Sequence, residues 1–139
     1  MVEPFAVVVH ACRRVKVAVG QNVLVCGAGP VGIMAMLCAK AFGADKVCIT
    51  DIDPSKLDLA KRMGADNTFL VNPKNFNDQE FEKNLQKDFG CSPDTTIECT
   101  GVESSNAFIN YELFLKIILK AFRCLYMRLK LGVRYVSSV

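Results

Sequence analysis

The feature that most constrains the fold is a set of three glycines between two apolar runs of different kinds. Residues 22–26 (NVLVC) form a short run rich in β-branched side chains, and residues 30–42 form a longer run rich in Ala, Met and Leu. Between the runs, residues 27–32 read Gly-Ala-Gly-Pro-Val-Gly, a G-x-G-x-x-G spacing. This order predicts a strand, a tight glycine turn and a helix.

The next runs repeat the alternation of strand and helix. Strands are predicted at 46–50, 68–71 and 95–99, and helices at 54–63 and 78–89. Asp53 and Pro54 supply an N-cap and a first helical residue for the second helix. Alternation at this spacing implies parallel strands joined by right-handed crossovers. The expected fold class is α/β, a Rossmann-like doubly wound parallel sheet, and it is expected to be incomplete because no further strand is evident until 133–139.

Each position in the glycine motif has a physical role in binding a dinucleotide. Gly27 permits the tight turn, Gly29 lets the backbone approach a pyrophosphate, and Gly32 lets the helix pack against the strand. The phosphates then meet free N–H groups at the helix N-terminus, where Pro30 and Val31 stand. Taken alone, the motif is equally compatible with an ordinary glycine-rich turn.

Asp51 strengthens the dinucleotide interpretation because it lies 19 residues after Gly32, at the end of the second predicted strand. A carboxylate there can accept both hydroxyl hydrogens of an adenosine ribose. A 2′-phosphate about 4 Å away would cost up to ~4 kcal/mol at an effective dielectric constant of 20, so NAD is expected rather than NADP. A strand-end cap is the alternative for Asp51. Lys56 is interpreted either as a ribose contact or as a solvated helix lysine.

Composition excludes several classes of partner. Residues 1–110 carry 11 basic and 13 acidic side chains, so we expect no nucleic-acid surface on this part of the chain. The seven cysteines include no C-x-x-C pair, which argues against a disulfide framework and a structural zinc site. Reduced thiols fit a cytoplasmic protein. Residues 1–25 do not follow signal-peptide order, and no transmembrane segment is expected.

Three strings resemble the sorbitol dehydrogenase branch of the zinc-containing medium-chain dehydrogenase/reductase family. They are Glu3-Pro4 with HACRR at 10–14, VLVCGAGPVG at 23–32, and TIECTG at 96–101. The resemblance covers residues 1–105. It implies a Rossmann domain that binds NAD beside a separate catalytic domain that holds one zinc ion. The implied reaction is hydride transfer between a secondary alcohol of a polyol and NAD.

The resemblance also implies roles for single residues. Residues 27–32 and Asp51 would bind NAD, Lys56 stands where the family often has an Arg beside the ribose, and Thr100 would lie near the nicotinamide half. Glu3 matches a carboxylate near the catalytic zinc and is the one catalytic candidate. The family's zinc ligands are a Cys and a His-Glu pair on a domain that would precede residue 1. We therefore expect no metal ligands here and no turnover by this chain alone.

Other polar residues receive structural interpretations. His10 has Arg13 and Arg14 at i+3 and i+4 rather than metal-binding partners, so we interpret it as a structural histidine. Cys12 is interpreted as buried packing, and Glu98 as a strand-end charge near the ligand crevice. The cysteines within predicted strands and helices are expected to act as small hydrophobes; they are Cys26, Cys38, Cys48 and Cys99.

The expected organisation is a linker helix at 1–20, an NAD-binding domain at 21–105 and a divergent tail at 106–139. If helical, the tail places a basic stripe within an arc of roughly 80°; its residues are Lys116, Lys120, Arg123, Lys130 and Arg134. We favour a product of truncation, alternative splicing or gene modelling over a membrane-surface segment. Alternative functions are a non-enzymatic nucleotide-binding or membrane-surface module, and part of another zinc dehydrogenase acting on threonine or a simple alcohol. A homo-oligomer is possible for a full-length form.

Overall fold

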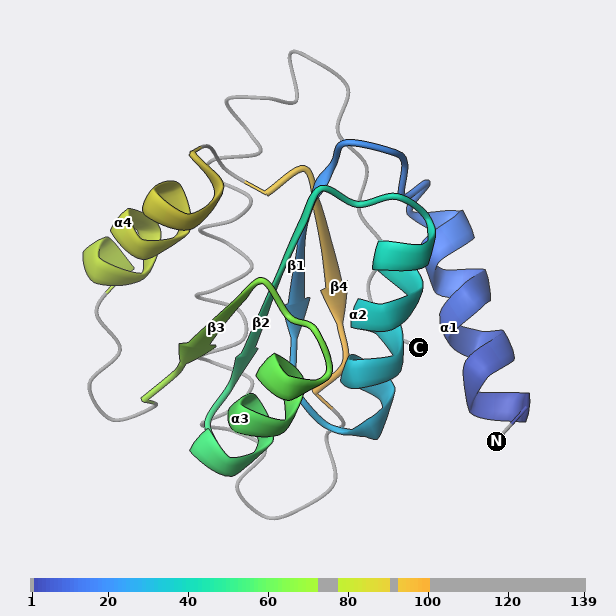
Figure 1. The fold of residues 1–139 in the computed structure, drawn as a ribbon, viewed down its shortest axis with the longest axis horizontal. Coiled ribbons are helices and arrows are strands. Elements are labelled where there is room, and N and C mark those ends of the chain that lie inside the picture. Colours follow the sequence, from blue (N-terminus) through green and yellow to red (C-terminus); the bar gives the residue numbers. More distant parts are fainter. Residues whose placement is uncertain (1, 73–77, 91–92, 101–139) are drawn as a thin grey trace.

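The helices and strands of this chain alternate as expected (Figure 1). The computed structural model describes residues 2–72, 78–90 and 93–100. The helices are α1 (Val2–Arg14), α2 (Pro30–Ala41), α3 (Pro54–Arg62) and α4 (Asp78–Phe89). The strands are β1 (Asn22–Cys26), β2 (Lys46–Asp51), β3 (Asn67–Leu70) and β4 (Thr95–Glu98). The bounds predicted for the strands and for α2, α3 and α4 lie within one residue of these, whereas the predicted strand at 133–139 and the basic tail lie outside the described residues.

The strands form a parallel sheet in the order β3-β2-β1-β4. This confirms the α/β, doubly wound fold class. The register pairs Cys26 of β1 with Thr50 of β2 and with Glu98 of β4. Because every strand runs in the same direction, their carboxyl ends meet at one edge of the sheet.

Helices cover both faces of the sheet, which explains why every residue of β1 is buried. Val23 and Val25 belong to a core that includes side chains of α1, α2 and α3. Leu24 and Cys26 point the other way, into a second core with Phe81 and Leu85 of α4. Burying an apolar side chain of this size stabilises the fold by about 1.5–3 kcal/mol, so this central strand contributes strongly to both layers.

Strand order decides where a ligand can bind. The chain passes from β1 to β2 to β3 in one direction, with α2 and α3 on one face. It then returns to the other side of β1 to form β4, and right-handed crossovers place α4 on the opposite face. The switch point therefore lies between β1 and β4, and the glycine turn that follows β1 lies there at the carboxyl edge of the sheet (Figure 1).

An N-cap and a buried apolar face explain where α3 begins and how α1 packs. The carboxylate of Asp53 accepts a hydrogen bond from the Ser55 amide at 2.9 Å, which confirms the expected N-cap of α3. On α1, Val8 and Cys12 share the core that contains side chains of α2, and Val15, just after the helix, joins the same core. The division of the chain into domains at residues 20 and 105 stays a prediction.

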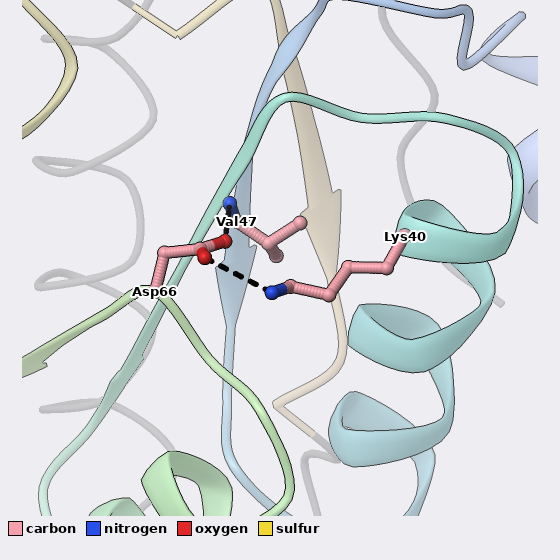
Figure 2. A network of polar contacts seen from close by, with 3 residues as sticks. All are labelled: Lys40, Val47 and Asp66. Atoms are coloured by element: carbon pink, nitrogen blue, oxygen red, sulfur yellow. Dashed lines mark hydrogen bonds and ion pairs between the residues drawn. The ribbon is translucent and has the colours of Figure 1, made fainter.

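Asp66 lies just before β3, and its side chain links the start of that strand to α2 and β2 (Figure 2). Its Oδ2 accepts the N–H of Val47 at the start of β2 at 2.8 Å, and its Oδ1 accepts a hydrogen bond from Lys40 Nζ of α2 at 3.0 Å. The Lys40 and Asp66 side chains are 33% and 34% exposed. Solvent screens the ion pair, whereas the amide bond is partly buried, so the amide bond should be the more important of the two.

We expect Asp66→Ala to lower the free energy of unfolding by about 1–3 kcal/mol, because the Val47 N–H loses its acceptor. Lys40→Met should cost less than about 1 kcal/mol. Asp66→Asn keeps an acceptor oxygen, so its loss of unfolding free energy should lie between those of Asp66→Ala and Lys40→Met. Urea unfolding of the three variants measures the difference. Equal losses in Asp66→Ala and Lys40→Met would show instead that the ion pair dominates.

Candidate functional site

Two glycines of the motif lie where no side chain fits. Gly27 follows β1 with φ 99°, and a Cβ there would lie 3.0 Å from the carbonyl atoms of Cys99 and from the amide nitrogen of Thr100. A Cβ on Gly32 would lie 1.8 Å from the carbonyl oxygen of Gly27. The first glycine therefore lets the turn pack against the end of β4, and the third lets α2 begin directly against the turn.

The middle of the motif is open. Gly29 is the N-cap of α2 with φ −70°, and a Cβ there would meet no atom within 4 Å. At the start of α2, Pro30 has no N–H, and the N–H groups of Val31 and Gly32 have no acceptor within the helix. A phosphate can therefore approach the backbone here, so the turn fits a dinucleotide.

Asp51 is the last residue of β2, and its carboxylate joins two loops. Oδ2 accepts the Ala28 N–H at 2.7 Å, and Oδ1 accepts the Asp53 N–H at 2.9 Å. Each carboxylate oxygen has two lone pairs, so both can accept a further hydrogen bond from a sugar hydroxyl. The sequence placed Asp51 at the strand end but did not indicate its bond to Ala28, which orients the glycine turn.

Lys56 is exposed in the first turn of α3. The pKa of Asp53 lies below its usual value, first because Ser55 donates hydrogen bonds to its carboxylate and to a lesser degree because Lys56 is near. Lys56 is thus close to the loop that Asp51 helps to hold. Both interpretations of this lysine, ribose contact and solvated helix residue, remain compatible with its position.

Glu98 and Thr100 are hydrogen-bonded to each other at the end of β4. Oε1 of Glu98 accepts the Thr100 N–H at 2.6 Å and also accepts the Thr100 hydroxyl. Oε2 is buried and has no hydrogen-bond partner among the described residues. Burial raises the pKa of Glu98 to about 7, although the bonds from Thr100 act in the opposite direction. The sequence placed Glu98 at a strand end but did not show this burial.

The described cysteines are all free thiols. Cys12, Cys26, Cys38 and Cys48 are buried, and Cys99 is half-buried just after β4. Burial raises the pKa of Cys12 and of Cys99 to about 12, and it raises the pKa of Cys26 well above the usual value. Few of these three thiols ionise at neutral pH, and the buried cysteines pack as small hydrophobes, as expected.

The residues of α1 do not assemble a metal site. Glu3 and His10 are exposed, whereas Cys12 is fully buried. His10 is therefore not part of the core, because α1 packs through only one face. Within the described ranges no three His, Cys, Asp or Glu residues lie close enough together to hold a metal ion. These residues do not fit a zinc ion, and we assign no chemical step to zinc here.

No helix in the described part of the chain combines the length and the hydropathy needed to cross a bilayer.

Comparison with known families identifies the chain. A family model described as "Zinc-binding dehydrogenase" matches residues 30–111, more than half of the sequence. The chain belongs to the zinc-binding dehydrogenase family. Sorbitol dehydrogenase from Bos taurus is 49% identical over 105 residues, which cover 76% of this chain and 29% of that protein. Sorbitol dehydrogenase from Homo sapiens is 45% identical over 105 residues, which again cover 76% of this chain and 29% of that protein. These similarities confirm the resemblance seen in the sequence.

Solved structures show the same fold. L-idonate 5-dehydrogenase from Escherichia coli superposes with a TM-score of 0.57 at 31% identity, covering 71% of this chain and 27% of that one. 2R,3R-butanediol dehydrogenase from Bacillus subtilis superposes with a TM-score of 0.58 at 31% identity, covering 73% of this chain and 28% of that one. The chain thus spans less than a third of the length of these relatives, as it does of the sorbitol dehydrogenases.

Proposed function

We propose that this chain is the NAD-binding part of an oxidoreductase similar to sorbitol dehydrogenase, which transfers hydride between a secondary alcohol of a polyol and NAD. One observation carries the proposal. An open glycine turn lies at the switch point of a parallel sheet, and the carboxylate of Asp51 bonds to the backbone of that turn. The similarity to sorbitol dehydrogenases supports the choice of a polyol as substrate.

Different residues of the described part of the chain would bind different parts of the cofactor. The pyrophosphate would lie beside Gly29 and accept hydrogen bonds from the amides of Val31 and Gly32. Asp51 would accept bonds from the hydroxyls of the adenosine ribose, with Lys56 beside the same sugar. When bound, NAD supplies the hydride acceptor at C4 of its nicotinamide ring.

Thr100 would orient the nicotinamide half of the cofactor, because it follows β4 on the other side of the switch point from Asp51. Glu3 is proposed to lie near the catalytic zinc of the whole enzyme, on the strength of the resemblance. We also propose a cytoplasmic location, which the free thiols of the described cysteines support.

Calorimetric titration of the purified chain with NADH tests the proposal. We expect saturable binding of one NADH per chain, and displacement of NADH by ADP-ribose, because the glycine turn and Asp51 contact only the ADP-ribose part. Circular dichroism confirms that the titrated chain is folded. If folded protein bound neither NADH nor ADP-ribose, the proposal would be wrong.

A further inference from the structure

The turn after β4 lies directly against the glycine motif. A Cβ on Gly27 would lie 3.0 Å from both the Cys99 carbonyl and the Thr100 amide nitrogen. The Cys99 N–H is also bonded to the carbonyl oxygen of Cys26 at 2.8 Å, which continues the β1–β4 ladder. Residues 99–100 therefore pack closely against the turn at Gly27 and are tied to the strand that precedes it.

Glu98 holds this turn with one oxygen and leaves the other unused. Oε1 accepts both the amide and the hydroxyl of Thr100, whereas Oε2 is buried with no partner in the described part of the chain. A buried carboxylate oxygen without a donor disfavours the charged form. A proton on Oε2 would remove the charge and leave Oε1 free to keep its two bonds to Thr100.

Among the residues that the structure describes, none that surrounds Glu98 neutralises its charge. Glu98 pairs with Cys26 in the β1–β4 register, so its side chain lies on the face covered by α4. The thiols of Cys26 and Cys99 are its titratable neighbours, and burial keeps both protonated. From α4, the apolar side chains of Phe81 and Leu85 enter the core, while the charged residues whose side chains are described are exposed; they are Glu80, Lys83 and Lys87. Asp51 lies beyond β1, at the end of β2.

We propose that Glu98 is a positioning residue of the dinucleotide site, which holds residues 99–100 against Gly27 and takes up a proton when the phosphates of the dinucleotide bind. The inference rests on the proposed function. Phosphate charges at the glycine turn disfavour a second negative charge at the neighbouring strand end, so the bound state favours the neutral acid. By linkage, a protein that gains a proton on binding binds more tightly at lower pH.

The affinity for NADH should therefore fall as the pH rises through the pKa of Glu98, which is about 7. We expect the dissociation constant to increase by about threefold to tenfold between pH 6 and pH 8.5. Glu98→Gln keeps an acceptor oxygen for Thr100 but cannot ionise. It should bind NADH with nearly the same affinity at both pH values. His10→Gln, which removes the single histidine of the chain, should keep the wild-type profile.

The measurement is calorimetric titration with NADH at pH 7 in two buffers of different ionisation enthalpy. Wild type should take up a fraction of one proton per NADH, and Glu98→Gln should take up none. Equal proton uptake in both proteins would overturn the inference and leave the proposed NAD site standing. Loss of NADH binding by the wild type at every pH would overturn both.

A second variant covers the case in which Glu98→Gln does not fold. Thr100→Val removes the hydroxyl bond that favours the ionised form of Glu98. The pKa of Glu98 should then rise, and the midpoint of the affinity profile should move to higher pH. An unchanged midpoint would count against the role of Glu98.

Discussion

Gly32→Ala is expected to lower the free energy of unfolding by about 3 kcal/mol or more. The new Cβ would lie 1.8 Å from the carbonyl oxygen of Gly27 and 2.9 Å from its carbonyl carbon, and both are backbone atoms. Neither can move without displacing the end of β1 or the start of α2. Denaturant unfolding followed by circular dichroism measures this loss of stability. If the wild type is only marginally stable, we expect the variant to be partly unfolded before any denaturant is added.

Gly29→Ala is the matched control, because the same change is made three residues earlier in the same turn. A Cβ there meets no atom within 4 Å, and φ −70° suits any residue. Stability should change by less than about 1 kcal/mol. The methyl group would instead occupy the space through which a pyrophosphate approaches, so NADH should bind at least tenfold more weakly. If Gly32→Ala were as stable as Gly29→Ala, the close contact of α2 with the turn would be absent from the folded protein.

Asp51→Asn is expected to change the choice between the two coenzymes by roughly a hundredfold. Repulsion between a 2′-phosphate and the Asp51 carboxylate is worth up to ~4 kcal/mol at 4 Å, and solvent reduces this to roughly 1–2 kcal/mol. The amide removes the repulsion, so NADPH should bind more tightly. NADH should bind about tenfold more weakly, because a neutral amide is a poorer acceptor for the ribose hydroxyls. Parallel titrations with NADH and NADPH give the ratio.

The structural role of Asp51 requires its own control. Asparagine has one acceptor oxygen, so it cannot accept from the amides of Ala28 and Asp53 on separate oxygens as Asp51 does. We expect a stability loss of about 1–2 kcal/mol, measured before the titrations. Asp58→Asn, an exposed site on α3, removes the same charge with no expected effect on coenzyme choice. An unchanged NADH to NADPH ratio in Asp51→Asn would contradict the assigned ribose contact.

Signals between residues that are near in the sequence explain why the bounds of most helices and strands could be predicted to within one residue. β1 is an apolar run that is followed directly by a glycine, and α3 starts where Asp53 accepts the Ser55 amide. Such signals act between residues close in the chain, so they do not depend on which strands become neighbours. The resemblance in three strings, including TIECTG at 96–101, added the family, which the match to residues 30–111 confirmed.

Contacts between distant residues were the part that these signals did not reveal. The bond from Ala28 to Asp51 spans 23 positions, and the contact of Gly27 with residues 99–100 requires β4 to lie beside β1. The burial of Glu98 follows from the β1–β4 register, and the exposure of His10 from the side on which α1 packs.

Periodicity, capping residues and glycine spacing were enough to establish the alternation of strands and helices, the parallel sheet and the turn that suits a diphosphate. Strand order and register determined which carboxylates lie beside that turn and how deeply each of them is buried. The physical reason is that hydrophobic patterning and caps are properties of neighbouring residues, whereas desolvation and hydrogen-bond partners depend on segments that meet only after the chain has folded.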